Sequence, residues 1–315
     1  MSGSEKSGSE KSGSEKSGSE KSGCSTSMET NSKADTLASR AWRRLKESRL
    51  TMLCMGIVLL YVLLAVGGYV HVVPDFQAKV GDKFASPQFG LKPSLWLGTD
   101  MFGRSIFFKL IAGVRTSMTL GVLVAFIAVP IGVTLGAVAG YFGGKVDAAV
   151  QWLYSVIVSI PYIILIVAMS YILGKGLLSI CVAMGLISWV GLCRLVRGEF
   201  IKLRDREFVL ASRLLGASHS RIIFKHILPN VLHIVVVSAS LEIMGAIKAE
   251  VILTYLGVGI QDGSSWGQMV VDAPGELVSG IWWPALGVSL ALFFIVFAFN
   301  RVGDALRDAL DPRLI

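Results

Sequence analysis

The chain has 315 residues, of which 53% are hydrophobic and only 17% are charged, and its mean hydropathy is +0.64. This composition is too apolar for a soluble domain of this length and predicts an α-helical membrane protein. The net charge of +8 does not indicate nucleic-acid binding, because the sequence has no aromatic or groove-reading pattern typical of such proteins.

The N-terminal segment is a low-complexity repeat. Ser-Gly-Ser-Glu-Lys occurs four times between Ser2 and Lys21 and is followed by Ser22-Gly23. Because the repeat has no apolar residue and its Glu and Lys balance, we expect residues 1–30 to be a disordered, solvated tail, with partner binding as the alternative. No apolar stretch precedes Cys24, so a lipoprotein cleavage site is not supported.

Six apolar runs are long enough to cross a bilayer, which takes roughly 20 residues of helix. They are Thr51–Val73, Thr116–Gly140, Ala148–Leu173, Leu177–Leu195, Val231–Gly257 and Ile281–Phe299. We expect the first run to remain as an anchor, because it is too long and too far from Met1 for a cleaved signal peptide. Pro130 and Pro161 lack a backbone donor and are candidates for helix kinks.

The basic residues predict the orientation of these spans. They concentrate before the first run, between the fourth and fifth runs, and after the sixth, whereas residues 258–280 contain no Lys or Arg. The positive-inside rule therefore predicts that the N- and C-termini are both cytosolic. The predicted external segment Ala78–Arg115 fits this rule less well, since it carries six basic residues.

A basic, amphipathic segment joins the fourth and fifth runs. It contains Gly216 and, thirteen residues later, Pro229. This pattern predicts a short helix, a glycine bend, a second short helix and a change of direction into the membrane at Pro229. One face of the first helix is predicted to consist of Phe208, Ala211, Ser212 and Leu215. The residues alone leave two interpretations: a docking element for a partner, or a helix lying among lipid headgroups.

The fifth run carries ionisable residues, Glu242, Lys248 and Glu250. Such groups are costly at membrane depth and usually face a cavity or one another, so we expect them to line a pathway or a subunit interface. The alternative is that they reach toward headgroups at the external face. Trp266, Trp282 and Trp283 are predicted to lie in an interfacial aromatic belt.

Catalytic and metal-binding motifs are not found in the sequence. It contains no Gly-x₄-Gly-Lys-Ser/Thr phosphate loop and no His-Glu-x-x-His. His219, His226 and His233 are spaced by seven, but a break at Pro229 would separate them. We therefore expect no enzyme, no catalytic residues and no metal site. Cys54, Cys181 and Cys193 are predicted to be buried thiols without disulfides.

Seven short stretches follow one another along the chain in a recognisable order. They are Trp96–Ser105 (WLGTDMFGRS), Gly113–Ser117 (GVRTS), Gly140–Asp147 (GYFGGKVD), Ser159–Pro161 (SIP), Leu210–Gly216 (LASRLLG), Ser265–Gly267 (SWG) and Gly303–Arg313 (GDALRDALDPR). In this order and spacing they resemble the dipeptide/oligopeptide branch of bacterial ABC-importer permeases. Leu210 stands where the family's coupling motif has Glu, and Ser105 stands where it has Asp.

This resemblance implies an all-α membrane protein with six transmembrane helices in the type I ABC-importer permease fold. It implies a multi-pass permease subunit in the bacterial cytoplasmic (inner) membrane that imports dipeptides or oligopeptides. The implied partners are a second homologous permease, two cytosolic ABC ATPase subunits and an extracytoplasmic solute-binding protein. ATP and Mg would bind to the ATPase subunits, with no cofactor on this chain.

The resemblance also implies a coupling site and a domain division. The residues expected to contact an ATPase subunit are Glu207, Leu210, Ala211, Ser212, Leu215, Gly216, Ala217 and Arg221. The expected divisions are the tail 1–30, a segment 31–112 with the first span and an external loop, a permease core 113–305 with a coupling loop 196–230, and a cytosolic tail 306–315. Two alternatives stay open: nickel-chelate or glutathione cargo within the same family, and a self-sufficient secondary transporter or channel.

Overall fold

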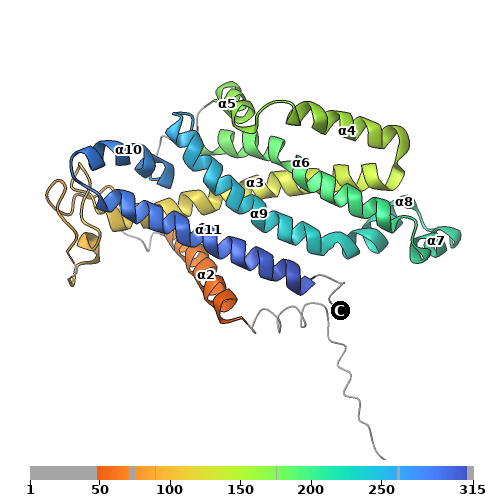
Figure 1. The fold of residues 1–315 in the computed structure, drawn as a ribbon, viewed down its shortest axis with the longest axis horizontal. Coiled ribbons are helices and arrows are strands. Elements are labelled where there is room, and N and C mark those ends of the chain that lie inside the picture. Colours follow the sequence, from red (N-terminus) through yellow and green to blue (C-terminus); the bar gives the residue numbers. More distant parts are fainter. Residues whose placement is uncertain (1–47, 71–75, 89, 175, 261–262, 311–315) are drawn as a thin grey trace, which may run out of the picture. The chain divides into compact units, whose positions relative to one another are not determined.

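The computed structural model describes residues 48–70, 76–88, 90–174, 176–260 and 263–310 (Figure 1). Contacts divide the chain into Met1–Asp35 and Thr36–Ile315, and every described residue belongs to the second unit. The repeat tail, Cys24 and the basic residues between 33 and 46 therefore lie outside the described residues.

The described part of the chain is almost entirely helical. Its elements are α2 (Arg49–Tyr69), the 3₁₀ turn η1 (Pro93–Leu95), α3 (Ile106–Phe142), α4 (Gly144–Val158), α5 (Tyr162–Leu173), α6 (Leu177–Leu203), α7 (Glu207–Leu214), α8 (His219–Arg221), the π-helical η2 (Ile222–Ile227), α9 (Leu228–Tyr255), α10 (Trp266–Val278) and α11 (Trp283–Leu310). Only two isolated β-bridges occur among the described residues. The predicted all-α class is confirmed.

Five helices are long and apolar enough to cross a membrane, and the pair α4 and α5 makes six if it counts as one span. This pair is bent by 88° at the break before Tyr162. Pro161 lacks the N–H that would bond to the carbonyl of Ile157, which accepts the N–H of Ile160 at 3.4 Å instead. The Ser159 hydroxyl donates to the carbonyl of Val156 at 2.7 Å. The predicted kink is therefore in the right place, but the run Ala148–Leu173 is a broken span and not a continuous helix.

The glycine row of α3 packs against α6. A Cβ on Gly132 would lie 2.9 Å from the carbonyl oxygen of Trp189, and a Cβ on Gly136 would lie 2.7 Å from that of Cys193. Gly140 is equally close to Phe200 and Arg197. Because these glycines have no side chain, the two backbones approach closely, as small residues allow in membrane helices.

The chain does not change direction at Pro229, which corrects the prediction above. His219–Tyr255 forms one continuous membrane-length helix that begins as α8, passes through η2 and continues as α9. The wider π-helical turn changes the hydrogen-bond register just before Pro229, where the proline lies in the first turn of α9 and has no N–H to bond. The histidines at 219, 226 and 233 therefore share one helix, and the predicted separation of these residues at Pro229 is wrong. Among the described residues, no group of three or more His, Cys, Asp or Glu could hold a metal ion.

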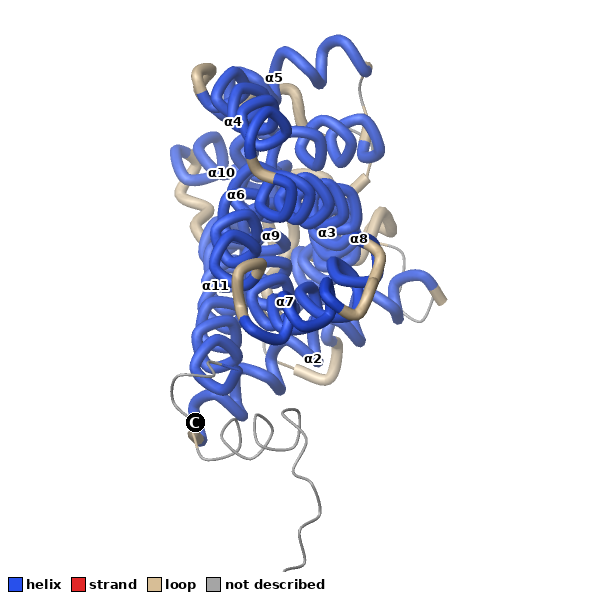
Figure 2. The backbone as a smooth tube through the Cα atoms, turned by 90° about the vertical axis from the view of Figure 1, so that its right-hand side faces the viewer, coloured by secondary structure: helices blue, strands red, loops and turns tan. Residues whose placement is uncertain are grey.

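α7 and α10 lie at opposite ends of the helices of this unit (Figure 1). Figure 2 looks onto the end that carries α7, with α3, α6 and α9 running away behind it. α11 runs to Leu310, well past the predicted sixth run and into the predicted tail. The two ends are the places where a partner in solution meets a membrane protein.

Candidate functional site

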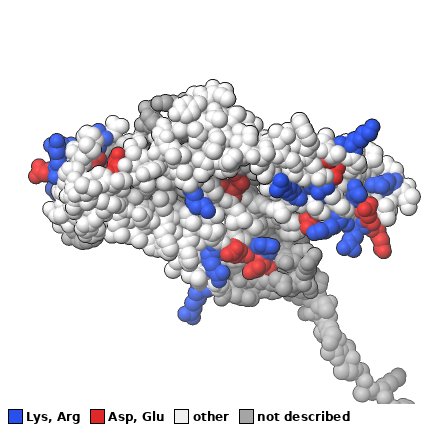
Figure 3. Space-filling model, turned by 45° about the horizontal axis from the view of Figure 1, so that its top comes forward, with Lys and Arg blue, Asp and Glu red and all other residues white. Residues whose placement is uncertain are grey.

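α7 presents apolar side chains to solvent at one end of the unit. Val209 is fully buried, whereas Leu214 and Leu215 are each 88% exposed, and Phe208 and Leu210 are also exposed. Figure 3 shows Lys and Arg gathered over the same right-hand end. A helix that exposes two adjacent leucines within a basic surface is typical of a docking element.

The reversal after α7 is made at Gly216, as predicted. Its φ is +78°, a left-handed conformation that residues with a Cβ resist. The N–H of Ala217 bonds to the carbonyl of Ser212 at 3.1 Å, which closes the end of the helix. Ser218 then begins α8 by accepting the N–H of Arg221 at 3.4 Å. The turn is therefore built from backbone and cap contacts.

α7 is fixed to the bundle from beneath. Val209 packs in one cluster with Phe200, Ile222 and other residues of α3, α6, η2 and α9. The Tyr141 hydroxyl and Nδ1 of His219 are 2.8 Å apart, and Arg204 donates from Nη1 to the carbonyl of Gly140 at 3.2 Å. A force on α7 would therefore reach α3, α6 and α9 through packed side chains.

The predicted coupling residues are mostly accessible. Glu207, Leu210, Ala211, Leu215, Gly216 and Arg221 are exposed, and Ser212 and Ala217 are half-buried. The Ser212 hydroxyl donates to its own helix, at the carbonyl of Phe208, so in this geometry it can only accept a hydrogen bond from a partner. Leu214 was missed by the sequence reasoning, although the Leu-Leu pair before the glycine was visible.

A partly buried ion pair joins α4 to α6 near the end that carries α7. Arg197 makes a bidentate contact with Asp147, from Nε to Oδ1 and from Nη2 to Oδ2. Gln151 adds a bond to Oδ2 at 2.9 Å. The planar guanidinium fork fits a carboxylate at two points, so this pair fixes the orientation of α4 as well as its position. In the sequence, Asp147 stands out only as the last residue of the stretch Gly140–Asp147.

The opposite end is closed by α10, and Trp266 anchors it. Trp266 is fully buried, donates from Nε1 to the carbonyl of Leu110 at 3.0 Å, and meets Tyr61 edge to face at 6.0 Å. Gly113 leaves the space for the indole, because a Cβ there would lie 2.5 Å from its ring. The prediction that Trp266 is a belt residue is therefore wrong, while Trp282 is 55% exposed.

Acidic residues surround Lys109 beside α10. Nζ of Lys109 lies 3.7 Å from Oδ2 of Asp100 and 3.5 Å from Oδ2 of Asp272. Burial raises the pKa of Glu276, and the nearby Lys109 acts in the opposite direction. Lys109 thus ties the loop before α3 to α10. This contact occupies one basic residue of the segment Ala78–Arg115, which was predicted to be external and fits the positive-inside rule poorly.

The three charged residues of α9 lie in three different environments. Glu250 is fully buried, and its Oε1 accepts the Thr254 hydroxyl at 2.9 Å. A Cβ on Gly267 would lie 3.0 Å from the same oxygen, so Glu250 sits directly under α10. Lys248 is exposed, and Glu242 is half-buried. The structure therefore does not bring the three charges together.

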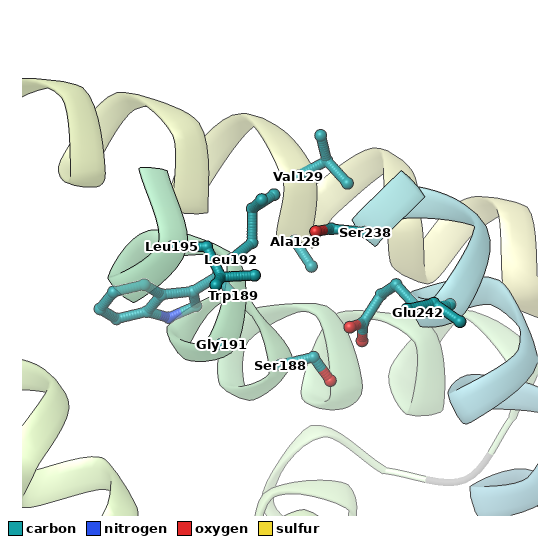
Figure 4. Close-up of a pocket in the computed structure, with 10 residues that line it drawn as sticks. Ala128, Val129, Ser188, Trp189, Gly191, Leu192, Leu195, Ser238 and Glu242 are labelled. Atoms are coloured by element: carbon teal, nitrogen blue, oxygen red, sulfur yellow. The ribbon is translucent and has the colours of Figure 1, made fainter. Parts of the chain in front are cut away.

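Glu242 belongs to an open hollow between α3, α6 and α9 (Figure 4). Its carboxylate points into the same space as the Ser188 hydroxyl of α6. A carboxylate facing hydrocarbon near the centre of a span costs about 2.5 to 3.5 kcal/mol. A surface of this kind is expected to face water or a partner subunit.

Two family models match this chain, which belongs to the family of binding-protein-dependent transport system inner membrane components. That model matches residues 132–315, and the N-terminal transmembrane domain of oligopeptide transport permease C matches residues 36–83. The chain is therefore an integral membrane permease subunit of the ABC-importer class.

Individual proteins agree with this assignment. The dipeptide transport system permease protein DppC of Bacillus subtilis is 37% identical over 303 residues, covering 91% of this chain and 92% of that protein. The oligopeptide permease OppC of the same organism is 34% identical, covering 90% and 92%. A structure of the inward-facing MetNI methionine ABC transporter has a TM-score of 0.52 at 20% identity, covering 65% of this chain and 97% of that chain. This last similarity shows the fold.

Proposed function

We propose that this chain is one of the membrane subunits of an ATP-driven importer of dipeptides or oligopeptides. The observation that carries the proposal is α7 with its C-cap residue Leu215: the helix packs on the bundle through Val209, while Leu214 and Leu215 are each 88% exposed. Two apolar side chains held in water are unfavourable unless a partner covers them. In this family the partner on the cytosolic side is an ATPase subunit, and the peptide cargo is proposed from the DppC and OppC relatives.

The proposed orientation places α7 and both termini in the cytosol and α10 outside. The support is the positive-inside rule, since the α7 end is rich in Arg and Lys and residues 263–280 near α10 have none. The proposed location is a bacterial cytoplasmic membrane. We keep the proposed divisions at 30/31, 112/113 and 305/306, with the coupling loop at 196–230.

The proposed mechanism is alternating access driven from α7. ATP binding would bring two partner ATPase subunits together, and each would move the α7 that is seated on it. Val209 and the Tyr141–His219 contact would pass this motion to α3 and α9. A second permease would face this one across the pathway, with Glu242 on its wall, and a solute-binding protein would deliver cargo at the α10 end. ATP and Mg would be held by the ATPase subunits.

Glu250 and Lys248 take different parts in this proposal. Glu250 would position α10 over the external end of α9, because it is enclosed between Thr254 and Gly267. Lys248 is exposed on α9 and would lie at the interface with the second permease, where its charge would meet a polar group. These roles agree with the expectation that ionisable groups in spans are functional.

Reconstitution in vesicles tests the function. The chain, a second permease, two ATPase subunits and a peptide-binding protein are expected to take up a labelled dipeptide only with ATP, and omission of any component should stop uptake. Uptake of a nickel chelate or of glutathione in place of the dipeptide would show that the proposed cargo is wrong, while the importer assignment would stand. Uptake by the chain alone, driven by an ion gradient, would contradict the importer assignment.

A further inference from the structure

The hollow between α3, α6 and α9 has a composition suited to one kind of ligand. Its volume is about 210 Å³. Its lining residues are Ala128, Val129, Ser188, Trp189, Gly191, Leu192, Leu195, Ser238, Leu241 and Glu242. One carboxylate and two serine hydroxyls therefore face an otherwise apolar wall, and Figure 4 shows Glu242, Ser188 and Ser238 around the open space.

The carboxylate of Glu242 has no counter-ion in the described part of the chain, where the ion pairs involve Asp100, Asp147, Glu199, Asp205 and Asp272. The Ser188 hydroxyl lies 3.1 Å from the hydroxyl of Tyr162, so a hydrogen-bonding chain continues from the hollow to α5. A half-buried anion beside two hydroxyls is complementary to a hydrogen-bonding cation. A primary ammonium group has three donors and matches three oxygens of this kind.

We propose that this hollow is a transient site for the protonated amino terminus of the cargo, with Glu242 as its counter-ion. Ser188 and Ser238 accept hydrogen bonds from the remaining ammonium N–H groups, and Trp189, Leu192 and Leu241 contact the first side chain. The volume fits the end of a peptide better than a whole one, since sites that enclose larger ligands span about 300 to 1,000 Å³. This inference rests on the proposed import function and adds a cargo-recognition step inside the membrane.

A cysteine in place of Ser238 can report the charge in the hollow beside Glu242. In an assembled transporter in which this chain carries Cys24→Ser, the remaining native thiols of this chain, Cys54, Cys181 and Cys193, are buried. We compare the rates at which trimethylammonium-ethyl and sulfonato-ethyl methanethiosulfonate modify Ser238→Cys. A carboxylate nearby concentrates the cation, so Glu242→Gln should lower the cation-to-anion rate ratio by about tenfold. The matched control Glu199→Gln removes a carboxylate that pairs with Lys202 outside the hollow and should leave the ratio unchanged.

Protection by cargo tests the ligand itself and does not depend on the Glu242 variant. Dialanine should slow modification of Ser238→Cys, whereas N-acetyl-dialanine at the same concentration should not, because acetylation removes the positive charge of the amino terminus. An unchanged rate ratio in Glu242→Gln, or equal protection by the two peptides, would overturn the inference; the first result is also expected if a cation of the second permease pairs with Glu242. These outcomes are separate from failure of the proposed function, which would appear as absence of ATP-dependent uptake by the wild-type complex.

Discussion

Replacing Gly216 with valine is expected to remove most ATP-driven uptake without affecting membrane insertion. The backbone at Gly216 has φ +78°, and a left-handed conformation costs a residue with a Cβ about 1 to 2 kcal/mol, more for a β-branched one. A Cβ at this position would meet no atom within 4 Å, so the effect comes from the backbone and not from a clash. A penalty of this size lowers the ratio of native to non-native conformations at the end of α7 by about 5- to 30-fold.

The matched control for this prediction is Gly216→Asn, because asparagine adopts the left-handed region more readily than other residues with a Cβ. Uptake of labelled dipeptide, divided by the amount of assembled complex, is the measurement. The asparagine variant should retain most activity. Equal activity of the valine variant and the wild type would show that the bend after α7 has no part in coupling.

Replacing Trp266 with alanine is expected to produce the largest loss of stability among single changes at the α10 end. Truncating a fully buried tryptophan typically costs about 3 to 5 kcal/mol, through lost burial and the cavity that remains. The variant also loses the hydrogen bond to Leu110 and the edge-to-face contact with Tyr61. Because α10 is held through this side chain, it should detach from α3 and α9.

The thermal unfolding midpoint of the solubilised complex measures this loss. Trp282→Ala is the matched control, since its indole is 55% exposed and truncation there should cost much less. Trp266→Phe should be intermediate, because it keeps an aromatic ring but not the donor to Leu110. If alanine at 266 and alanine at 282 lowered the midpoint equally, Trp266 would not be the anchor of α10.

The spans and their close packing follow from sequence because each rests on a local pattern. Long apolar runs predict membrane-length helices, and glycines every fourth residue in α3 indicate a close approach to another helix, but only the structure shows that this helix is α6. Prolines were harder to interpret. Pro161 lies at the break between α4 and α5, whereas Pro130 lies inside the uninterrupted α3 and Pro229 follows a π-helical turn within one continuous helix. The outcome depends on which neighbours satisfy the freed carbonyls, and this is a tertiary property.

Side-chain environments were predicted least well, because they depend on packing between distant segments. Tryptophan is a residue type typical of the interfacial belt, but Trp266 is buried because Gly113, far away in the sequence, has no side chain and leaves room for the indole. Glu242 and Glu250 share a helix, yet one faces a hollow and the other lies under α10. The α7 bend was predictable because a single glycine sets it.

The contact between α7 and an ATPase subunit is the central claim, and photo-crosslinking tests it most directly. A benzophenone amino acid is placed at Leu215, which is 88% exposed, and in a control at Leu232, which is exposed on α9 within the span. Illuminated cells that contain the whole transporter should yield an adduct between the Leu215 probe and the ATPase subunit, while the Leu232 probe should yield none. Adducts of the Leu215 probe with lipid alone would contradict the account.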